Sequence, residues 1–201
     1  MIGIVDYQAG NIKSVELALA YLGHSFITSG KPEILQSCER LIIPGDGHAG
    51  STMEVLAQTG LGAFLKDYYK QGKWMLGICI GCQIILEGSD EADTKCLGLI
   101  PGRCHKLPGG KGIKVPHMGW NQCVPQRDHF LFSGVPTDSS FYFVHSYFTS
   151  PSLQSDVLGL TDHGIQFPSA IGRENLWAFQ FHPEKSGKWG LKLLANFLEA
   201  T

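Results

Sequence analysis

Leu76-Gly77-Ile78-Cys79-Ile80-Gly81-Cys82-Gln83 is the stretch that decides the fold. The apolar run Trp74–Ile78 leads into it and predicts a buried strand. Glycine and cysteine then alternate through a tight turn, after which we expect a helix. Side chains beside such a bend would collide with neighbouring backbone, and Gly77 and Gly81 avoid this because they carry no Cβ. The pattern indicates a nucleophile elbow that presents Cys79 at a helix N-terminus, where the helix dipole favours the thiolate.

Two other uses of this cysteine remain open on the motif alone. Cys79 and Cys82 form a C-x-x-C pair, which is also found in thiol redox modules and in zinc sites. A zinc site needs a second ligand pair of similar spacing, and the sequence offers none. A redox pair explains neither of the two glycines, so acyl transfer by Cys79 is the preferred interpretation.

Composition places broad limits on the rest of the molecule. The 201 residues suffice for one domain, 1–201, with a core of ordinary size, and 43% of them are hydrophobic. A net charge of −2 argues against a nucleic-acid-binding surface. The six cysteines show no disulfide-framework spacing, and the N-terminus does not resemble a signal peptide. We therefore expect a cytoplasmic protein that binds neither nucleic acid nor membrane.

The first half of the chain alternates apolar strands with helical segments. Strands are expected at 2–5, 24–28, 41–43 and 74–78, with helices beginning at Ile12, after Asn11 as N-cap, and at Pro32. One or two helices are expected over 51–71. This order predicts an α/β fold with a doubly wound, mostly parallel sheet.

The second half of the chain has a different sequence pattern. After an acidic loop at 88–95, short segments broken by glycine and proline are expected to form antiparallel strands: 97–100, 103–107, 113–115, 141–148, 157–160, 169–172 and 176–181. A final helix, capped by Ser186, is expected over 188–199. The predicted architecture is therefore a parallel sheet with a β-rich antiparallel extension.

Two loops are expected to meet Cys79 at the carboxyl edge of the sheet. Pro44–Gly50 follows one strand and contains three glycines, which allows backbone amides to turn towards a ligand, as an oxyanion site requires. His182-Pro183-Glu184 lies in an extended segment, where positions two apart point the same way. A cysteine nucleophile needs a base, and the base needs a carboxylate to orient its ring. His182 and Glu184 supply both.

These motifs together resemble those of the class I glutamine amidotransferases, whose fold is flavodoxin-like. The elbow is similar to the family's G-x-C-x-G-x-Q and residues 182–184 to its H-P-E. Within the family, the resemblance is to the glutaminase subunits of imidazole glycerol phosphate synthase, and it covers nearly the whole chain. It is carried by Asp6-Tyr7-Gln8-Ala9-Gly10-Asn11, Pro44-Gly45-Asp46-Gly47, Lys114–Asn121 and Tyr142–Tyr147.

The resemblance implies a glutaminase that needs no cofactor or metal. Cys79 would attack the side-chain amide of glutamine while His182, oriented by Glu184, moves the proton. Residues implied to bind glutamine or the oxyanion are Gly45, Asp46, Gly47, Ile80, Gln83, His145, Ser146 and Tyr147. Those implied to face a (β/α)8-barrel cyclase in a heterodimer are Asn11, Met118, Trp120, Asn121, Tyr142 and Lys185.

The resemblance also implies where the ammonia goes. The cyclase would use it to make imidazole glycerol phosphate and aminoimidazole carboxamide ribonucleotide in histidine biosynthesis. An alternative is the same glutaminase chemistry serving a cyclase-like partner in surface-sugar amidation.

Asp46 is a departure from the family pattern, which has valine at this position. A carboxylate facing the site would repel the negative charge that develops on the oxyanion. We therefore expect Asp46 to point away from it. Gln8 replaces a glycine and Cys82 a methionine, and neither change touches the three catalytic groups.

Overall fold

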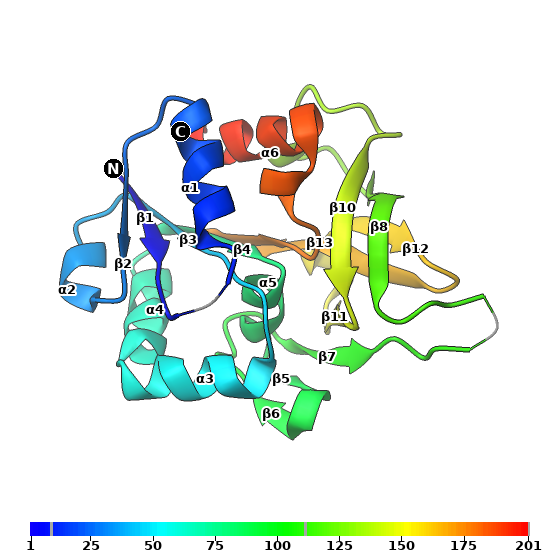
Figure 1. Ribbon diagram of the computed structural model, residues 1–201, viewed down its shortest axis with the longest axis horizontal. Coiled ribbons are helices and arrows are strands. Elements are labelled where there is room, and N and C mark those ends of the chain that lie inside the picture. The colour runs from blue at the N-terminus through cyan, green and yellow to red at the C-terminus, as the bar shows by residue number, and fades with distance from the viewer. Residues whose placement is uncertain (9, 111, 201) are drawn as a thin grey trace.

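Figure 1 shows the computed structural model, which describes residues 1–8, 10–110 and 112–200. Ala9, in the expected loop at residues 6–11, lies outside the described residues, as do Lys111 and Thr201. No helix in the described ranges is long and apolar enough to cross a membrane.

An eight-stranded sheet organises the fold in the order β2-β1-β3-β4-β14-β13-β12-β9. Its first five strands are mutually parallel, and the last three continue it antiparallel. The parallel strands are β1 (Ile2–Val5), β2 (Phe26–Ser29), β3 (Arg40–Ile43), β4 (Trp74–Ile78) and β14 (Leu176–Phe179). The antiparallel ones are β9 (Val124–Pro125), β12 (Val157–Asp162) and β13 (Gln166–Arg173). The predicted α/β sheet with an antiparallel extension is confirmed.

Helices cover both faces of the parallel half. In Figure 1, α1 (Ile12–Tyr21) and α6 (Gly187–Glu199) lie above the sheet, whereas α3 (Ala49–Gln58) and α4 (Leu61–Lys70) lie below it. The short helix α2 (Pro32–Leu35) precedes β3, and α5 (Ile80–Ile84) follows β4. Single-turn 3-10 helices are η1 (Glu91–Asp93), η2 (Phe130–Phe132), η3 (Gln154–Asp156) and η4 (Pro183–Lys185).

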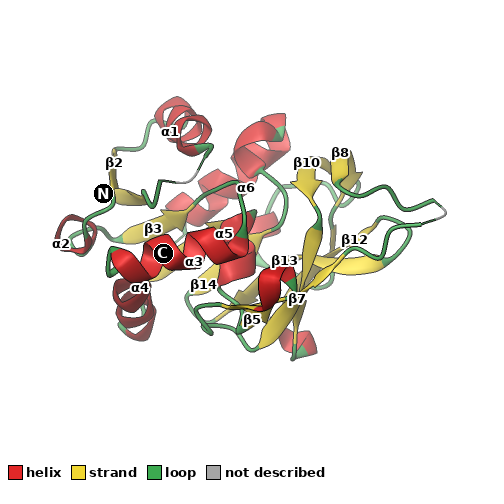
Figure 2. Cartoon of the chain, turned by 60° about the horizontal axis from the view of Figure 1, so that its bottom comes forward, coloured by secondary structure: helices red, strands yellow, loops and turns green. Residues whose placement is uncertain are grey.

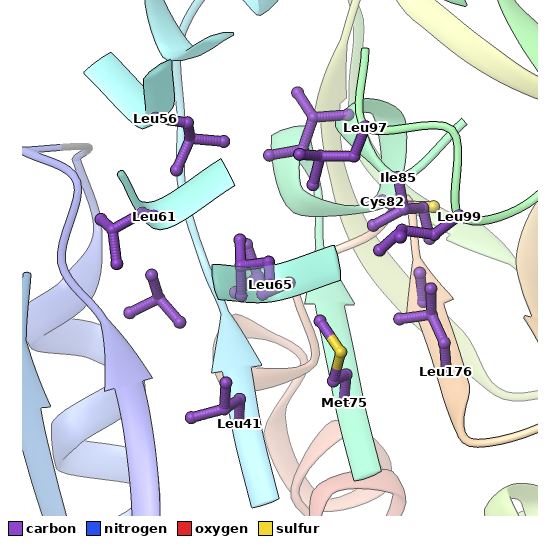
Figure 3. Close-up of a cluster of buried hydrophobic side chains, with 14 of the residues drawn as sticks. Leu41, Leu56, Leu61, Leu65, Met75, Cys82, Ile85, Leu97, Leu99 and Leu176 are labelled. Carbon is purple, nitrogen blue, oxygen red and sulfur yellow. The ribbon is translucent and has the colours of Figure 1, made fainter. Parts of the chain in front are cut away.

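The period of two along each strand sends alternate side chains to opposite cores. Leu41 and Met75 face Leu61 and Leu65 of α4, as Figure 3 shows. Ile42, Leu76 and Ile78 face the other way, into the cluster filled by α1 and α6. Because β4 is buried on both faces, its sequence is a continuous apolar run rather than an alternating one.

The β-rich part also contains two small sheets. One pairs β8 (His117–Gln122) with β10 (Ser140–His145), which lie together at the end of the molecule far from α2 in Figures 1 and 2. The other contains β11 (Tyr147–Pro151), β7 (Gly102–Lys106), β5 (Gly88–Ser89) and β6 (Thr94–Lys95) in that order.

Several predicted segments were wrong in detail. The segment 176–181 was expected to be antiparallel throughout, but β14 runs parallel to β4 and antiparallel only to β13. Residues 97–100 and 113–115 form no strand, the strand expected at 141–148 is broken at Ser146, and the acidic loop 88–95 contains β5, η1 and β6. Strand direction depends on the neighbouring strand, which the local pattern does not specify.

The order of the sheet brings three distant segments to one edge. β4 lies between β3 and β14, and all three run the same way. Their carboxyl ends therefore lead side by side into the loop at Pro44–Gly47, into Cys79 and into the segment at His182, as the sequence predicted.

Candidate active site

Cys79 occupies the strained bend between β4 and α5. Its φ of 54° and ψ of −105° lie in a region that side-chain-bearing residues rarely adopt. A Cβ on Gly77 would lie 2.6 Å from the Gly81 carbonyl oxygen, and one on Gly81 only 2.0 Å from that of Ile43. Both contacts are with backbone, which cannot move aside. The predicted elbow, and the reason for its glycines, are confirmed.

His182 is held in a fully buried position beside this bend. Its backbone N–H donates to the Tyr142 carbonyl at 2.9 Å, and its ring Nδ1 lies 2.8 Å from Oε1 of Glu184, whose side chain is also buried. Because a carboxylate only accepts, the Nδ1 atom carries the proton. Nε2 is therefore the ring atom left to exchange a proton with a nucleophile.

The cysteine and the histidine meet as the sequence predicted. Cys79 Sγ and a ring nitrogen of His182 lie within 4.8 Å of one another. Burial alone would lower the pKa of His182, but its interactions with Cys79 and Glu184 outweigh this and raise the pKa to about 10. The arrangement therefore favours the imidazolium form of His182 beside the Cys79 sulfur.

Asp46 also faces this pair, which corrects the expectation that it points away. Its Oδ1 lies 3.4 Å from Nε2 of His182, and its Oδ2 lies 4.0 Å from Nζ of Lys185. The attraction of the histidine and the lysine supplies a physical reason for this orientation. Both cations come from a segment more than a hundred residues away, so the local sequence gave no sign of them.

The loop that carries Asp46 does not yet form an oxyanion site. The backbone N–H of Ile80, one of the expected donors, is bonded to the Gly45 carbonyl at 3.4 Å. Gly45 and Gly47 have φ values of 150° and 136°. The loop therefore directs a carbonyl towards the elbow in this conformation, and Ile80 N–H would become available to an oxyanion only if the Gly45 carbonyl turned away.

A cavity of about 510 Å³ opens in front of Cys79. The expected binding residues that line it are Asp46, Gly47, Ile80, Gln83, His145, Ser146 and Tyr147, joined by Tyr142 and Lys185 from the expected docking set. Gln83 is fixed at the cavity wall because its Nε2 donates to the Tyr147 carbonyl at 3.1 Å and to Oε1 of Gln180 at 3.2 Å. Gly45 is not among the lining residues, and its carbonyl accepts from Ile80 as described.

Two supporting residues were missed by the sequence analysis. Gln180, which is fully buried, touches Cys79 Sγ through Nε2 at 3.9 Å as well as orienting Gln83. His117 lies 2.9 Å from His145 through Nδ1 and Nε2, while Nδ1 of His145 donates to the Tyr147 carbonyl at 2.8 Å. Only the position of Gln180, two residues before His182 on an extended segment, could have indicated its direction.

The expected docking residues are divided among several environments. Met118 and Trp120 are 63% and 60% exposed on one side of β8, and Trp120 pairs with Tyr142 on β10. Asn121 donates to the Asp162 carbonyl at 2.8 Å and contacts Nε2 of His117. The strands that carry them, β8 and β10, lie together at one end of the molecule (Figure 2).

Asn11 does not cap α1 through its side chain, as the sequence had predicted. It precedes α1 with a left-handed backbone, and its side chain makes no capping hydrogen bond. Instead its amide donates to Oε1 of Glu184 and lies 3.3 Å from Nδ1 of His182. Ser186 likewise caps nothing, since its hydroxyl accepts from Tyr142 N–H and donates to the His182 carbonyl. Both residues position His182 and Glu184.

Cys82 does not share the surroundings of Cys79. All six cysteines, each in the described part of the chain, are free thiols. Cys82 is fully buried in the cluster below the sheet, and burial raises its pKa well above the usual range. A thiol in this state is a poor partner for thiol exchange, which argues against the redox interpretation.

Residues 4–201 match the family model "Glutamine amidotransferase class-I". The chain is similar to "Imidazole glycerol phosphate synthase subunit HisH" of Maridesulfovibrio salexigens, with 49% identity covering 99% of this chain and 96% of the relative. The protein of that name from Nitratidesulfovibrio vulgaris is 45% identical over 98% of this chain and 95% of its own length.

A solved structure described as a glutamine amidotransferase has the same fold. It superimposes with a TM-score of 0.79 at 18% identity, covering 98% of this chain and 97% of the other. At this level of identity the agreement concerns the fold alone.

Proposed function

This chain belongs to the class I glutamine amidotransferases, and from that premise we propose that it is the glutaminase subunit of an imidazole glycerol phosphate synthase. The family match spans nearly the entire sequence, and two relatives that carry the subunit's name are 49% and 45% identical over 96% and 95% of their own length. These relatives favour histidine biosynthesis over surface-sugar amidation. We further propose that residues 1–201 act as a single domain.

Cys79, His182 and Glu184 carry the reaction. The Cys79 thiolate attacks the side-chain carbonyl carbon of glutamine, and the imidazolium of His182 gives its Nε2 proton to the leaving nitrogen, so that ammonia departs and a γ-glutamyl thioester forms. Water then attacks the thioester with its proton passing to His182, which releases glutamate and returns the thiolate. Glu184 keeps the ring in the required orientation through the 2.8 Å contact with Nδ1.

Substrate glutamine would occupy the cavity beside Cys79. Gln83 and the backbone of His145–Tyr147 line that space and would hold the amide and the amino-acid end of the substrate. The oxyanion would be received by the N–H of Ile80 and by the loop at Gly45–Gly47. Because the Ile80 N–H is engaged by Gly45 here, full activity requires the loop to reorient.

A cyclase partner would supply the reason for that reorientation. The partner proposed is a (β/α)8-barrel in a cytoplasmic heterodimer whose overall reaction is classed as that of a lyase. Exposed Met118 and Trp120, with Tyr142 and Lys185 at the mouth of the cavity, would face it. Binding at this end of the molecule can act on the site directly, because the Tyr142 carbonyl anchors His182.

The observation that carries the proposal is the approach of Cys79 Sγ to the His182 ring within 4.8 Å, with Glu184 behind the ring. The test is ammonia release from glutamine, with and without the co-purified cyclase and its ligand. Cys79→Ala should abolish it, and a glutamine-analogue electrophile should label Cys79. The matched change Cys82→Ser should leave turnover within a few-fold of the wild type.

Some outcomes would contradict this assignment. Turnover that survives in Cys79→Ala, or that depends on Cys82, would favour another chemistry. Stimulation by the cyclase of another pathway, with none by that of histidine biosynthesis, would overturn the partner. Glutaminase turnover that is already maximal without a partner would contradict the reorientation of the loop.

A further inference from the structure

A set of metal-ligand atoms converges at the edge of the sheet. Cys79, His182 and Asp46 each direct one donor atom to a common point, and these sulfur, nitrogen and oxygen atoms all lie within 4.8 Å of one another. Thiolate, imidazole and carboxylate are the three donor types that bind Zn²⁺ in proteins. The ligands follow three different strands, so no short spacing in the sequence indicated them.

The distances are close to those that a tetrahedral ion requires. With bonds of about 2.0 Å to nitrogen and oxygen and about 2.3 Å to sulfur, neighbouring donors lie roughly 3.3–3.6 Å apart. The Oδ1 of Asp46 and Nε2 of His182 are already 3.4 Å apart. Cys79 Sγ lies within 4.8 Å of both atoms and needs to approach them by at most about 1.2 Å.

Two donor atoms at this point lack other partners within the described structure. Nε2 of His182 and Oδ1 of Asp46 are both buried from solvent, and apart from their mutual approach at 3.4 Å neither has a hydrogen-bond partner there. His182 itself is fully buried. Buried polar atoms are normally paired, so these two atoms remain available to bind a shared ligand.

The surroundings complete the arrangement. Nδ1 of His182 donates to Glu184, which is the carboxylate–histidine pairing that orients metal-bound imidazoles. Lys185 lies near Oδ2 of Asp46 and leaves Oδ1 for the ion. The cavity of about 510 Å³ provides room for water at a fourth position. Bound Zn²⁺ and Lys185 would balance the charges of Asp46, Glu184 and the Cys79 thiolate.

We propose that Cys79, His182 and Asp46 form a site for a thiophilic divalent cation such as Zn²⁺, which reversibly blocks the nucleophile and its base. On binding, the imidazolium of His182 loses its Nε2 proton to solvent, and Nε2 and the Cys79 thiolate both bond to the ion. Asp46 is the third ligand. Where the family has valine at this position, no third ligand would be available, so tight binding is a property of this chain.

The test measures metal binding without turnover. Co²⁺, which reports thiolate ligation through its charge-transfer absorption, is titrated into the metal-free protein and then displaced with Zn²⁺. The wild type should bind a single equivalent with a sulfur-to-cobalt band. That band should disappear in Cys79→Ser and persist in Cys82→Ser, which alters the neighbouring buried thiol.

The metal affinity of Asp46 variants is the decisive test of the proposal. Asp46→Val and Asp46→Asn should both weaken the binding of Co²⁺ and Zn²⁺ at least tenfold. Asp67→Asn, an exposed change on α4, should leave the affinity unchanged. Zn²⁺ should also protect Cys79 of the wild type from alkylation, as seen by mass spectrometry, and a chelator should reverse this. Equal affinity in the Asp46 variants, or a band that survives in Cys79→Ser, would overturn the site. Neither result would affect the glutaminase assignment, which is tested by ammonia release.

Discussion

Cys79 and Asp46 follow neighbouring parallel strands, yet the two turns that hold them are built differently. The elbow at Cys79 is enclosed, because Gly77 and Gly81 lie against backbone with no room for a Cβ. The loop at Asp46 is open: a Cβ on Gly47 would meet nothing within 4 Å, and a cavity of about 170 Å³ lies against the loop. The nucleophile is fixed before any ligand arrives, whereas the loop expected to stabilise charge has space to move.

The segment around His182 is enclosed like the turn at Cys79, unlike the open loop at Asp46. His182 and the side chain of Glu184 are both fully buried, and Asn11, Tyr142 and Ser186 hold them through hydrogen bonds. A site with a rigid nucleophile and base, but a movable oxyanion loop, can be switched by moving the loop alone. The following predictions test this division, beginning with the largest effect.

Replacing Glu184 should cause the largest loss of glutaminase turnover, because Glu184 orients the buried catalytic base His182. Glu184→Gln keeps the shape of the side chain but removes the charge that stabilises the His182 imidazolium. We expect the turnover number to fall by about 10³–10⁴-fold. Steady-state ammonia release in the presence of the cyclase measures it. Glu33→Gln, an exposed change on α2, is the control. A fall of less than tenfold would show that the pair is not needed.

The same glycine-to-alanine change should have unequal costs in the two turns. In Gly81→Ala the new Cβ would lie 2.0 Å from the Ile43 carbonyl oxygen, so the free energy of unfolding should drop by about 3 kcal/mol or more. Gly47→Ala meets only the backbone strain of its φ of 136°, which costs about 1 kcal/mol. Urea unfolding of both variants measures the difference. Equal costs would remove the distinction between a closed and an open turn.

Acid should lower the stability of the folded protein through two buried histidines, His117 and His145. Burial lowers the pKa of His145 to about 3 and that of His117 to about 4, from an ordinary value of 6.5. Both stay neutral in the folded protein while the unfolded chain takes up protons below about pH 6.5, so stability falls as the pH falls through this range. At pH 5 each of these histidines costs about 2 kcal/mol relative to pH 8. The raised pKa of His182 offsets about 2 kcal/mol of that total, because its contribution to stability is complete at pH 5 and partly lost by pH 8, so a net loss of about 2 kcal/mol is expected.

Unfolding titrations at both pH values would measure that loss. His117→Gln should flatten the dependence on pH, whereas His24→Gln, a change in the loop before β2, should preserve it. The prediction fails if the wild type is equally stable at pH 5 and pH 8.

The same contrast explains what could be read from the sequence. The elbow was predictable because its glycine–cysteine pattern is contained within a few residues, although the contact that excludes a side chain at Gly81 comes from Ile43. The meeting of Cys79 with His182 followed from strand ends sharing an edge. The directions of Asp46 and Asn11 were not predictable, because each is determined by His182 and its neighbours, which lie far away in the sequence. Local patterns fix backbone shape, whereas side-chain direction on an open loop depends on charges brought by the fold.

Substitution of Asp46 should give the smallest effect of the four, measured as glutaminase turnover. It is also the change that tests the open loop most directly. A full charge about 5 Å from the developing oxyanion would cost roughly 3 kcal/mol at an effective dielectric of 20. Lys185 and solvent reduce this, since the Asp46 side chain is 42% exposed. Asp46→Asn should therefore raise partner-free glutaminase turnover by about tenfold, measured with a chelator present and with Asp67→Asn as the control. Unchanged turnover would mean that the loop carries Asp46 away before the charge develops. A slower variant would instead give Asp46 a supporting role next to His182, and the open loop would then be part of the catalytic machinery before any partner binds.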